Sequence, residues 1–354
     1  MQCRIVAPEE LTIADLTAWS ACADAAIEPN PFLEPEWLLP ALDHLDESAT
    51  ARLVIVEHDG AIHALAPVEQ IAAGHDAIGE PQAHSALVTR VAPTAVALGT
   101  PLVTHGGGAE AAAILLAGLR HEAERLGAGH VILEWVGADG PIAPMLQGVL
   151  AHADHPLVQF DCWERAMLRR RPGDEDGYCL RHIGNNRRRT IRQHRRRMEE
   201  ALGVTPGVRR RTDRAAIDAF LRLEASGWKG HDVDGLALRQ RDGATAFFET
   251  ACRQFLSEGR LWFHSLEHDR VPIAMICMVR AGEGEFAYRT AYDEDLAKFG
   301  PGVEVFVDAM QQFEGSTDGC WLDTCAAPGN QHLMGLFPDS HAMTTLMLRV
   351  PERS

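Results

Sequence analysis

The amino-acid sequence predicts an α/β protein made of two similarly built halves, each a mixed, mostly antiparallel sheet flanked by helices. Three observations support this prediction. The chain has 354 residues, about twice the length of a common single domain. Hydrophobic residues make up 46% and charged residues 23%, so each half can bury a core of its own. Helix-like and strand-like segments also follow one another in a similar order in both halves.

The first half, residues 1–170, is expected to begin with two helical segments and a strand pair. Thr12 has the side chain to cap a helix that includes Leu16 and Trp19. A second helical segment follows Asn30-Pro31, and Asp59-Gly60 separates two apolar runs, which is a strong hairpin signal. The rest of this half is predicted as a strand at 98–103, a glycine break at 105–108, a helix at 109–126, a strand at 130–136, a helix at 141–150 and a strand at 156–168.

The second half, residues 171–354, is expected to start after a polar, glycine-containing linker, with the boundary between Arg169 and Ile183. A basic helix should run from about 186 to 202 and end at Gly203. The later elements are predicted as helices from 213 to about 227 and at 244–258, a hairpin around His268-Asp269, a strand from about 285 to 292, a helix at 302–313, a short strand near 321–323 and a last strand at 341–350.

Charge is distributed unevenly along the chain. The formal net charge is −17, yet the segment from Arg165 to Arg214 holds 16 arginines and six acidic residues, a local balance of +10. The remainder therefore carries −27, which disfavours general nucleic-acid binding. The local excess, with seven arginines between Arg187 and Arg197, can serve either as a solvated helix face or as an anion site.

Several classes of protein are disfavoured by simple counts. No apolar run approaches the roughly 18 residues that a membrane-spanning helix needs, and no signal peptide is recognisable. The eight cysteines are scattered without a CxxC pair, which favours reduced thiols and a cytoplasmic location. The 17 histidines show no ligand spacing, so we expect no metal.

Four ordered stretches resemble GNAT-superfamily acetyltransferases, most closely the cellulose-biosynthesis branch, a distant relative of Fem-type aminoacyltransferases. They are NNRRRTIRQHRRRMEEALG, FLRLEASGWKG, AYRTAYDEDLAKFGPGVEVF and WLDTCAAPGN, and together they extend from about residue 183 to 330. NPFLEPEWLLPAL and LGTPLV extend the resemblance weakly into the first half. The resemblance implies tandem GNAT-like domains, with acetyl-CoA or another acyl-CoA bound by the C-terminal one.

The acyl-CoA site is expected between a strand and a helix. A pyrophosphate needs free backbone N–H groups at a helix start and glycines that let it approach. In this family the loop reads Q/R-x-x-G-x-G/A, and here the glycines match while Ala297 stands at the first position. The predicted cofactor-binding residues are Lys298, Phe299, Gly300, Pro301, Gly302 and Val303.

Transfer of an acyl group from a thioester to an amine needs a positioned amine, a base, a donor to the carbonyl and an acid for the thiolate. The carbonyl donor in this fold is usually a backbone N–H, here on the strand at about 286–291. Asp323, at the end of a short apolar strand, and Glu224, four residues before Trp228, are the predicted catalytic bases, although either can equally be a structural anchor.

The acceptor side is predicted from residues near these elements. The leaving-thiol tyrosine common in the family is missing, since no tyrosine follows Tyr292; Cys325, Asn330 or His332 can replace it. The predicted substrate-binding residues are Trp228, Lys229, Arg289, Tyr292, Asp293, Cys325 and Asn330.

Three functions remain open from the sequence. The first is an acyl-CoA-dependent N-acyltransferase acting on a small amine or sugar amine. The second is a tRNA-dependent aminoacyltransferase, favoured by the arginine-rich helix and opposed by the overall acidity. The third is a non-catalytic GNAT-like scaffold, favoured by Ala297 and the missing tyrosine.

Overall fold

The computed structural model describes residues 1–45, 50–74, 85–151, 154, 156–171, 177–226, 237–316 and 318–351. The chain divides into two compact units: unit 1 comprises Met1–Glu164 with His341–Ser354, and unit 2 comprises Arg165–Ser340. This division differs from the expected domains, 1–170 and 171–354, in two places. Unit 2 begins at Arg165, before the expected window from Arg169 to Ile183, and the C-terminal residues from His341 onward belong to unit 1. The last strand of the chain pairs within the sheet of unit 1, which is why its residues belong there.

The sheet of unit 1 has the strand order β1-β2-β3-β4-β6-β13. All neighbours are antiparallel except β4 and β6, which are parallel. The two-residue strand β5 pairs with β3. The bounds are Gln2–Val6 for β1, Arg52–His58 for β2, Ala61–Ile71 for β3, Ala86–Val88 for β4, Leu102–Val103 for β5, His130–Gly137 for β6 and Asp339–Arg349 for β13.

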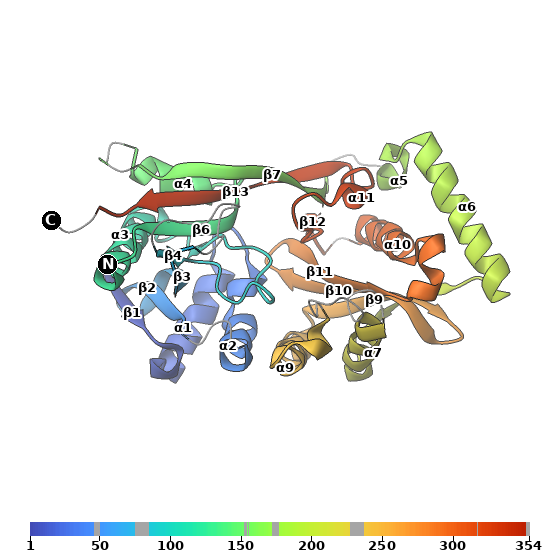
Figure 1. Ribbon diagram of the computed structural model, residues 1–354, viewed down its shortest axis with the longest axis horizontal. Coiled ribbons are helices and arrows are strands. Elements are labelled where there is room, and N and C mark those ends of the chain that lie inside the picture. Colours follow the sequence, from blue (N-terminus) through green and yellow to red (C-terminus); the bar gives the residue numbers. More distant parts are fainter. Residues whose placement is uncertain are drawn as a thin grey trace. The chain divides into compact units, whose positions relative to one another are not determined.

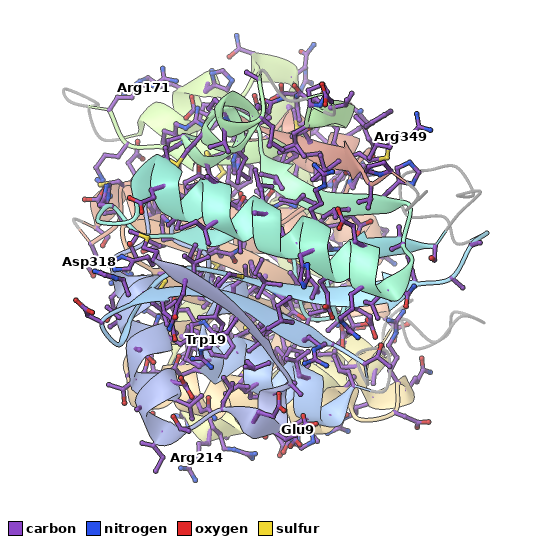
Figure 2. All side chains as sticks on the ribbon, turned by 90° about the vertical axis from the view of Figure 1, so that its left-hand side faces the viewer. Glu9, Trp19, Arg171, Arg214, Asp318 and Arg349 are labelled. Atoms are coloured by element: carbon purple, nitrogen blue, oxygen red, sulfur yellow. The ribbon has the colours of Figure 1, made fainter. Side chains whose placement is uncertain are left out.

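Helices cover both faces of this sheet. Figure 2 shows α3 crossing one face, while α1, which carries the labelled Trp19, lies on the other. On the side of α3 and α4 the core is aliphatic and joins these helices to the strands. Elsewhere in unit 1 the large aromatic side chains of Trp19, Phe32 and Trp37 are fully buried. The bounds are Ile13–Asp24 for α1, Pro35–His44 for α2, Gly108–Leu126 for α3 and Ile142–Val149 for α4, with short 3-10 turns at Pro8–Glu10 (η1) and Pro31–Leu33 (η2).

The sheet of unit 2 has the order β7-β12-β11-β10-β9-β8. Here too one neighbouring pair, β11 and β12, is parallel and the others are antiparallel. The bounds are Val158–Arg169 for β7, Gly207–Arg211 for β8, Leu261–His268 for β9, Val271–Ala281 for β10, Gly284–Tyr292 for β11 and Trp321–Asp323 for β12.

In unit 2, α10 packs on one face of the sheet and α7 and α9 on the other (Figure 1). The arginine-rich α6 packs beside α10 rather than on the sheet. The bounds are Tyr178–His182 for α5, Asn185–Leu202 for α6, Arg214–Ser226 for α7, Ala244–Ser257 for α9, Pro301–Gly315 for α10 and Gln331–Met334 for α11, with 3-10 turns at Leu238–Gln240 (η4) and Glu294–Phe299 (η5).

The two units repeat one topology. The series β1, α1–α2, β2, β3, β4, α3, β6, α4 in unit 1 corresponds to β8, α7–α9, β9, β10, β11, α10, β12, α11 in unit 2. The final strand of each series is exchanged. Unit 2 completes its sheet with the end of β7, the strand that follows α4, and unit 1 completes its sheet with β13, the strand that follows α11.

The predicted fold class, two similarly built α/β halves, is confirmed by this repeat. Local signals were also reliable: Gly203 ends α6 with a left-handed φ of 75°, and Asp59-Gly60 makes the β2–β3 turn with φ of 49° and 80°. The β9–β10 turn lies one residue later than expected, at Asp269-Arg270. Among the described residues, no helix combines the length and apolarity that crossing a membrane demands.

Glu134 of β6 gives unit 1 a pH-dependent stability. Burial raises the pKa of this carboxyl from 4.5 to about 7, and nearby Arg90 opposes the shift. The folded protein therefore keeps a proton that the unfolded chain releases, so stability falls as pH rises from about 4.5 to about 7 and stays lower above that. Glu134→Gln should stabilise by about 1–3 kcal/mol at pH 8 and by much less at pH 5. Thermal unfolding at both pH values measures this difference; equal shifts would contradict it.

Candidate active site

A cavity of about 670 Å³ lies within unit 2. Four elements surround it: β11, the start of α10, the segment after β12, and α11 with the residue before it. Its described lining residues are Ala287, Tyr288, Arg289, Thr290, Tyr292, Ala297, Gly300, Pro301, Gly302, Val303, Phe306, Thr324, Cys325, Ala326, Ala327, Asn330, His332 and Leu333.

An edge of β11 that is not paired with β12 borders the cavity. The parallel pairing of β11 with β12 ends at Phe286 and Asp323, whereas β11 continues to Tyr292. A β-bulge at Tyr288 shifts the register against β10, because Cys277 opposes Arg289 while Met278 opposes Ala287. Bulges bend a strand and redirect its side chains. The strand therefore presents both backbone and side chains to the cavity along this stretch.

The N-terminus of α10 forms the opposite wall. Gly300 caps the helix with a left-handed φ of 64°, and Pro301 occupies the first turn. The N–H of Gly302 has no acceptor among the described residues. A Cβ at this position would lie 3.2 Å from Cδ1 of Tyr292, so glycine keeps the approach open. The N–H groups of Val303 and Glu304 donate to the Gly300 carbonyl, which leaves the N–H of Gly302 for a ligand. This N–H lies at the positive end of a 15-residue helix, where an anion such as a pyrophosphate is favoured.

The start of α3 in unit 1 is built differently. The N–H of Gly107 donates to Oγ1 of Thr104 at 3.0 Å, and the N–H of Gly108 donates to the Thr104 carbonyl. A Cβ at Gly107 would lie 2.9 Å from Cβ of His63, so the backbone here packs closely against β3.

Glu224 and Arg289 form an ion pair beside the cavity. Oε1 of Glu224 lies 3.1 Å from Nε of Arg289, and Oε2 accepts the backbone N–H of Leu238 at 3.0 Å. Glu224 is 2% exposed and does not line the cavity, whereas Arg289 does. The carboxylate therefore holds the guanidinium in place.

A second buried pair supports the wall made by Cys325. Nη1 of Arg165 lies 3.6 Å from Oδ1 of Asp323, and both side chains are fully buried. The same Oδ1 accepts the backbone N–H of Cys325 at 2.6 Å. Cys325 has a φ of 51°, a strained value for a residue with a side chain, so this hydrogen bond fixes the turn that points the chain into the cavity.

The structure brings part of the predicted site together. The predicted residues that line the cavity are Arg289, Tyr292, Gly300, Pro301, Gly302, Val303, Cys325 and Asn330. Asp323, Glu224, Asp293, Lys298 and Phe299 do not line it among its described walls. Asp293 instead caps η5 through the N–H of Asp295, and Nζ of Lys298 lies 5.1 Å from the Phe299 ring centre. Trp228 and Lys229 lie outside the described residues.

The arginine-rich helix α6 flanks this site from within unit 2. Arg187 donates to the carbonyl of the lining residue His332, and Arg195 pairs with Glu304 of α10 at 3.1 Å. Arg189, Arg192 and Arg197 have no such partner in the described part of the chain. The helix thus combines anchored arginines with available ones.

Comparison with known proteins agrees with this geometry. Residues 185–318 match the acetyltransferase (GNAT) domain family. The match covers α6 to the end of α10, the part that carries the cavity's free strand edge and the helix N-terminus. It supports an acyltransferase enzyme and relates residues 185–318 to the GNAT superfamily. A search of curated proteins finds no match.

Solved structures resemble the GNAT-containing chain over nearly its whole length. FemX has a TM-score of 0.59 at 11% identity, with 98% of this chain and 97% of that chain covered. A conserved protein of unknown function from Bacteroides thetaiotaomicron has a TM-score of 0.57 at 12% identity, covering 97% and 98%. L-PGS from Bacillus licheniformis has a TM-score of 0.51 at 11% identity, with 92% of this chain and 94% of that chain covered. At such identities the likeness concerns the fold alone.

Several residues of the GNAT-domain cavity were not predicted from the sequence. Tyr288, Thr290, Thr324 and Ala326 line it because of the bulge and because β12 stops at Asp323. The AYRTAY and DTCAA strings around them were visible, but nothing in those letters indicates where strand pairing ends. Consecutive residues of β11 line the cavity because of where that pairing ends, and not because of their residue types.

Proposed function

We propose that the chain is an acyl-CoA-dependent N-acyltransferase that acts on a small amine or sugar amine. The observation that supports this most is the cavity that joins the free edge of β11 to the open N-terminus of α10. The N–H of Gly302 would donate to the pyrophosphate, with Gly300 and Val303 forming the backbone around it, and the strand edge would pair with the extended arm of the cofactor. We extend the proposal to the cellulose-biosynthesis branch of the superfamily, on the sequence strings it shares, and to a cytoplasmic location.

The chain's own groups would contribute mainly by position and hydrogen bonding. A backbone N–H on the free edge of β11 would donate to the thioester carbonyl as negative charge develops there. The amine would attack that carbonyl, and the thiolate would leave with a proton. Glu224 and Asp323 would act as positioning residues, since both are engaged with arginines behind the wall.

Cys325 is our candidate for the group that donates a hydrogen bond to the leaving thiolate, which solvent then protonates. Burial, with a further contribution from Asp323, raises the pKa of its thiol well above 9.0, so the thiol stays protonated at neutral pH. It lines the cavity in a fixed turn. Cys325→Ala should lower kcat about 10²-fold with acetyl-CoA binding retained.

Steady-state rates of thiol release, with affinity measured separately by calorimetry, check this prediction. Cys162→Ala, which removes an exposed thiol in unit 1, is the matched control and should keep its rate. A normal kcat for Cys325→Ala would leave Asn330 as the hydrogen-bond donor to the leaving thiolate, or His332 as the group that protonates it.

A second candidate function, tRNA-dependent aminoacyl transfer, is favoured by one observation. Arg189, Arg192 and Arg197 on α6 have no acidic partner in the described part of the chain, so they are available to a polyanion. The net charge of −17 argues against it, because most of the chain would repel a long polyanion.

The two functions differ in which ligand stabilises the folded protein. Thermal unfolding should be measured with acetyl-CoA, a longer acyl-CoA and an aminoacyl-tRNA, because binding to the native state raises the midpoint. We expect an upward shift with acyl-CoA only. A shift with aminoacyl-tRNA alone, disappearing steeply with salt, would overturn the ranking.

A further inference from the structure

We propose that the acceptor carries an oxyanion, a carboxylate or a phosphate, and that Arg289 binds it in the cavity. This inference rests on the proposed acyl-transfer function and specifies its substrate class. The inference rests on the guanidinium of Arg289. Glu224 binds its Nε, and Nη1 makes no hydrogen bond.

The Arg289 side chain is anchored through one atom. Its Nε lies 3.1 Å from Oε1 of Glu224, so the last turn of α7 holds a side chain that belongs to β11. Nη1 is buried and makes no hydrogen bond in the structure. The side chain is 18% exposed and contributes to the cavity wall. Since Nη1 is covered, a ligand oxygen would bind first at the exposed part of the guanidinium. A buried N–H without an acceptor is costly, so a turn of the side chain that brings Nη1 to the ligand would be favoured.

Arg289 is also the only formally charged side chain among the cavity's described lining residues at neutral pH. The two nearby carboxylates, Glu224 and Asp323, lie behind the wall and are paired with arginines. A cationic amine alone would therefore meet a cation and no described carboxylate. An amine that also carries an oxyanion would place that group on Arg289 and leave its amino group free to approach the thioester.

The planar fork of a guanidinium suits both carboxylate and phosphate oxygens, which it can bind through two parallel hydrogen bonds. Lysine keeps the charge that balances Glu224 but loses the fork. The substitution Arg289→Lys should therefore preserve the fold and remove most of the preference for an anionic acceptor over a neutral one.

The test compares amines in matched pairs, with acetyl-CoA as the donor: glycine with glycinamide, and glucosamine 6-phosphate with glucosamine. In at least one pair, kcat/KM should favour the anionic member about 10- to 100-fold, and Arg289→Lys should bring that ratio close to one. The pair that discriminates identifies the oxyanion. Arg222→Lys is the control, since Arg222 lies on α7 in an exposed pair with Asp218.

A second readout does not depend on turnover. Phenylglyoxal modification of Arg289, followed by mass spectrometry, should be slowed by the anionic member of a pair and not by the neutral one, while modification of Arg222 is unaffected. Absence of protection by either oxyanion would overturn the inference, as would an equal loss of kcat for both members in Arg289→Lys. Failure of the wild type to bind acetyl-CoA would instead refute the proposed function.

Discussion

Replacing Gly302 by aspartate is expected to raise the dissociation constant for acetyl-CoA by about 10²–10³-fold. The new carboxylate would stand at the start of α10, where it would occupy the place of the pyrophosphate and repel it; two like charges about 4 Å apart cost about 4 kcal/mol near a protein surface. The side chain would also approach Tyr292, since a Cβ there lies 3.2 Å from Cδ1. Calorimetric titration with acetyl-CoA measures the loss.

The fold should survive this change, because an acidic residue in the first turn of a helix is favoured by the dipole. Gly315→Asp is a matched control at the other end of α10, where a Cβ meets nothing within 4 Å. Its affinity should equal that of the wild type. If Gly302→Asp binds acetyl-CoA normally, the donor does not lie at the N-terminus of α10.

Replacing Asp323 by alanine should lower the free energy of unfolding by about 3–5 kcal/mol. The change would remove the carboxylate that lies 3.6 Å from the fully buried Arg165, and breaking one partner of a buried pair is far more costly than breaking a surface pair. It would also free the backbone N–H of Cys325 from its 2.6 Å hydrogen bond. Chemical denaturation measures the loss.

Asp218→Ala is the control for this experiment. Asp218 pairs with Arg222 at 3.6 Å with more than half of each side chain exposed, so its removal should cost no more than about 1 kcal/mol. Asp323→Asn separates structure from chemistry, because the amide can still accept from Cys325. A stable Asp323→Asn variant with a rate lowered 10²–10⁴-fold would restore the sequence-based prediction that Asp323 is a base.

Much of the fold could be predicted from local signals. Capping by Thr12, the hairpin at Asp59-Gly60 and the stop at Gly203 each depend on a few neighbouring residues, so the sequence contains the whole cause. The strands β1, β4 and β8 were missed. The five residues of β8, GVRRR, form a strand only because β9 pairs with them, and no apolar alternation marks them.

The candidate site likewise contains some residues whose positions follow from local sequence and others whose positions depend on distant partners. Gly300 and Gly302 were predictable because a phosphate-binding helix start depends on glycines in sequence. The placement of Glu224 and Asp323 was not, since each position is decided by a distant arginine: Arg289 and Arg165 respectively. A carboxylate near a cavity can point into it or can pair with a residue behind the lining. Which of these occurs depends on the partner that the fold places beside it.

The exchanged final strands set an order of events during synthesis. Unit 1 pairs β6 with residues 343–349, so its sheet is completed only after unit 2 has been made. Unit 2 takes Met167–Arg169 from a segment that is made before the rest of it. The half made first is thus the half whose sheet closes last. Until then the outer edge of β6 has unpaired backbone groups, and a gene cut between the two halves would yield one fragment with that edge permanently open and another with β12 lacking its neighbour.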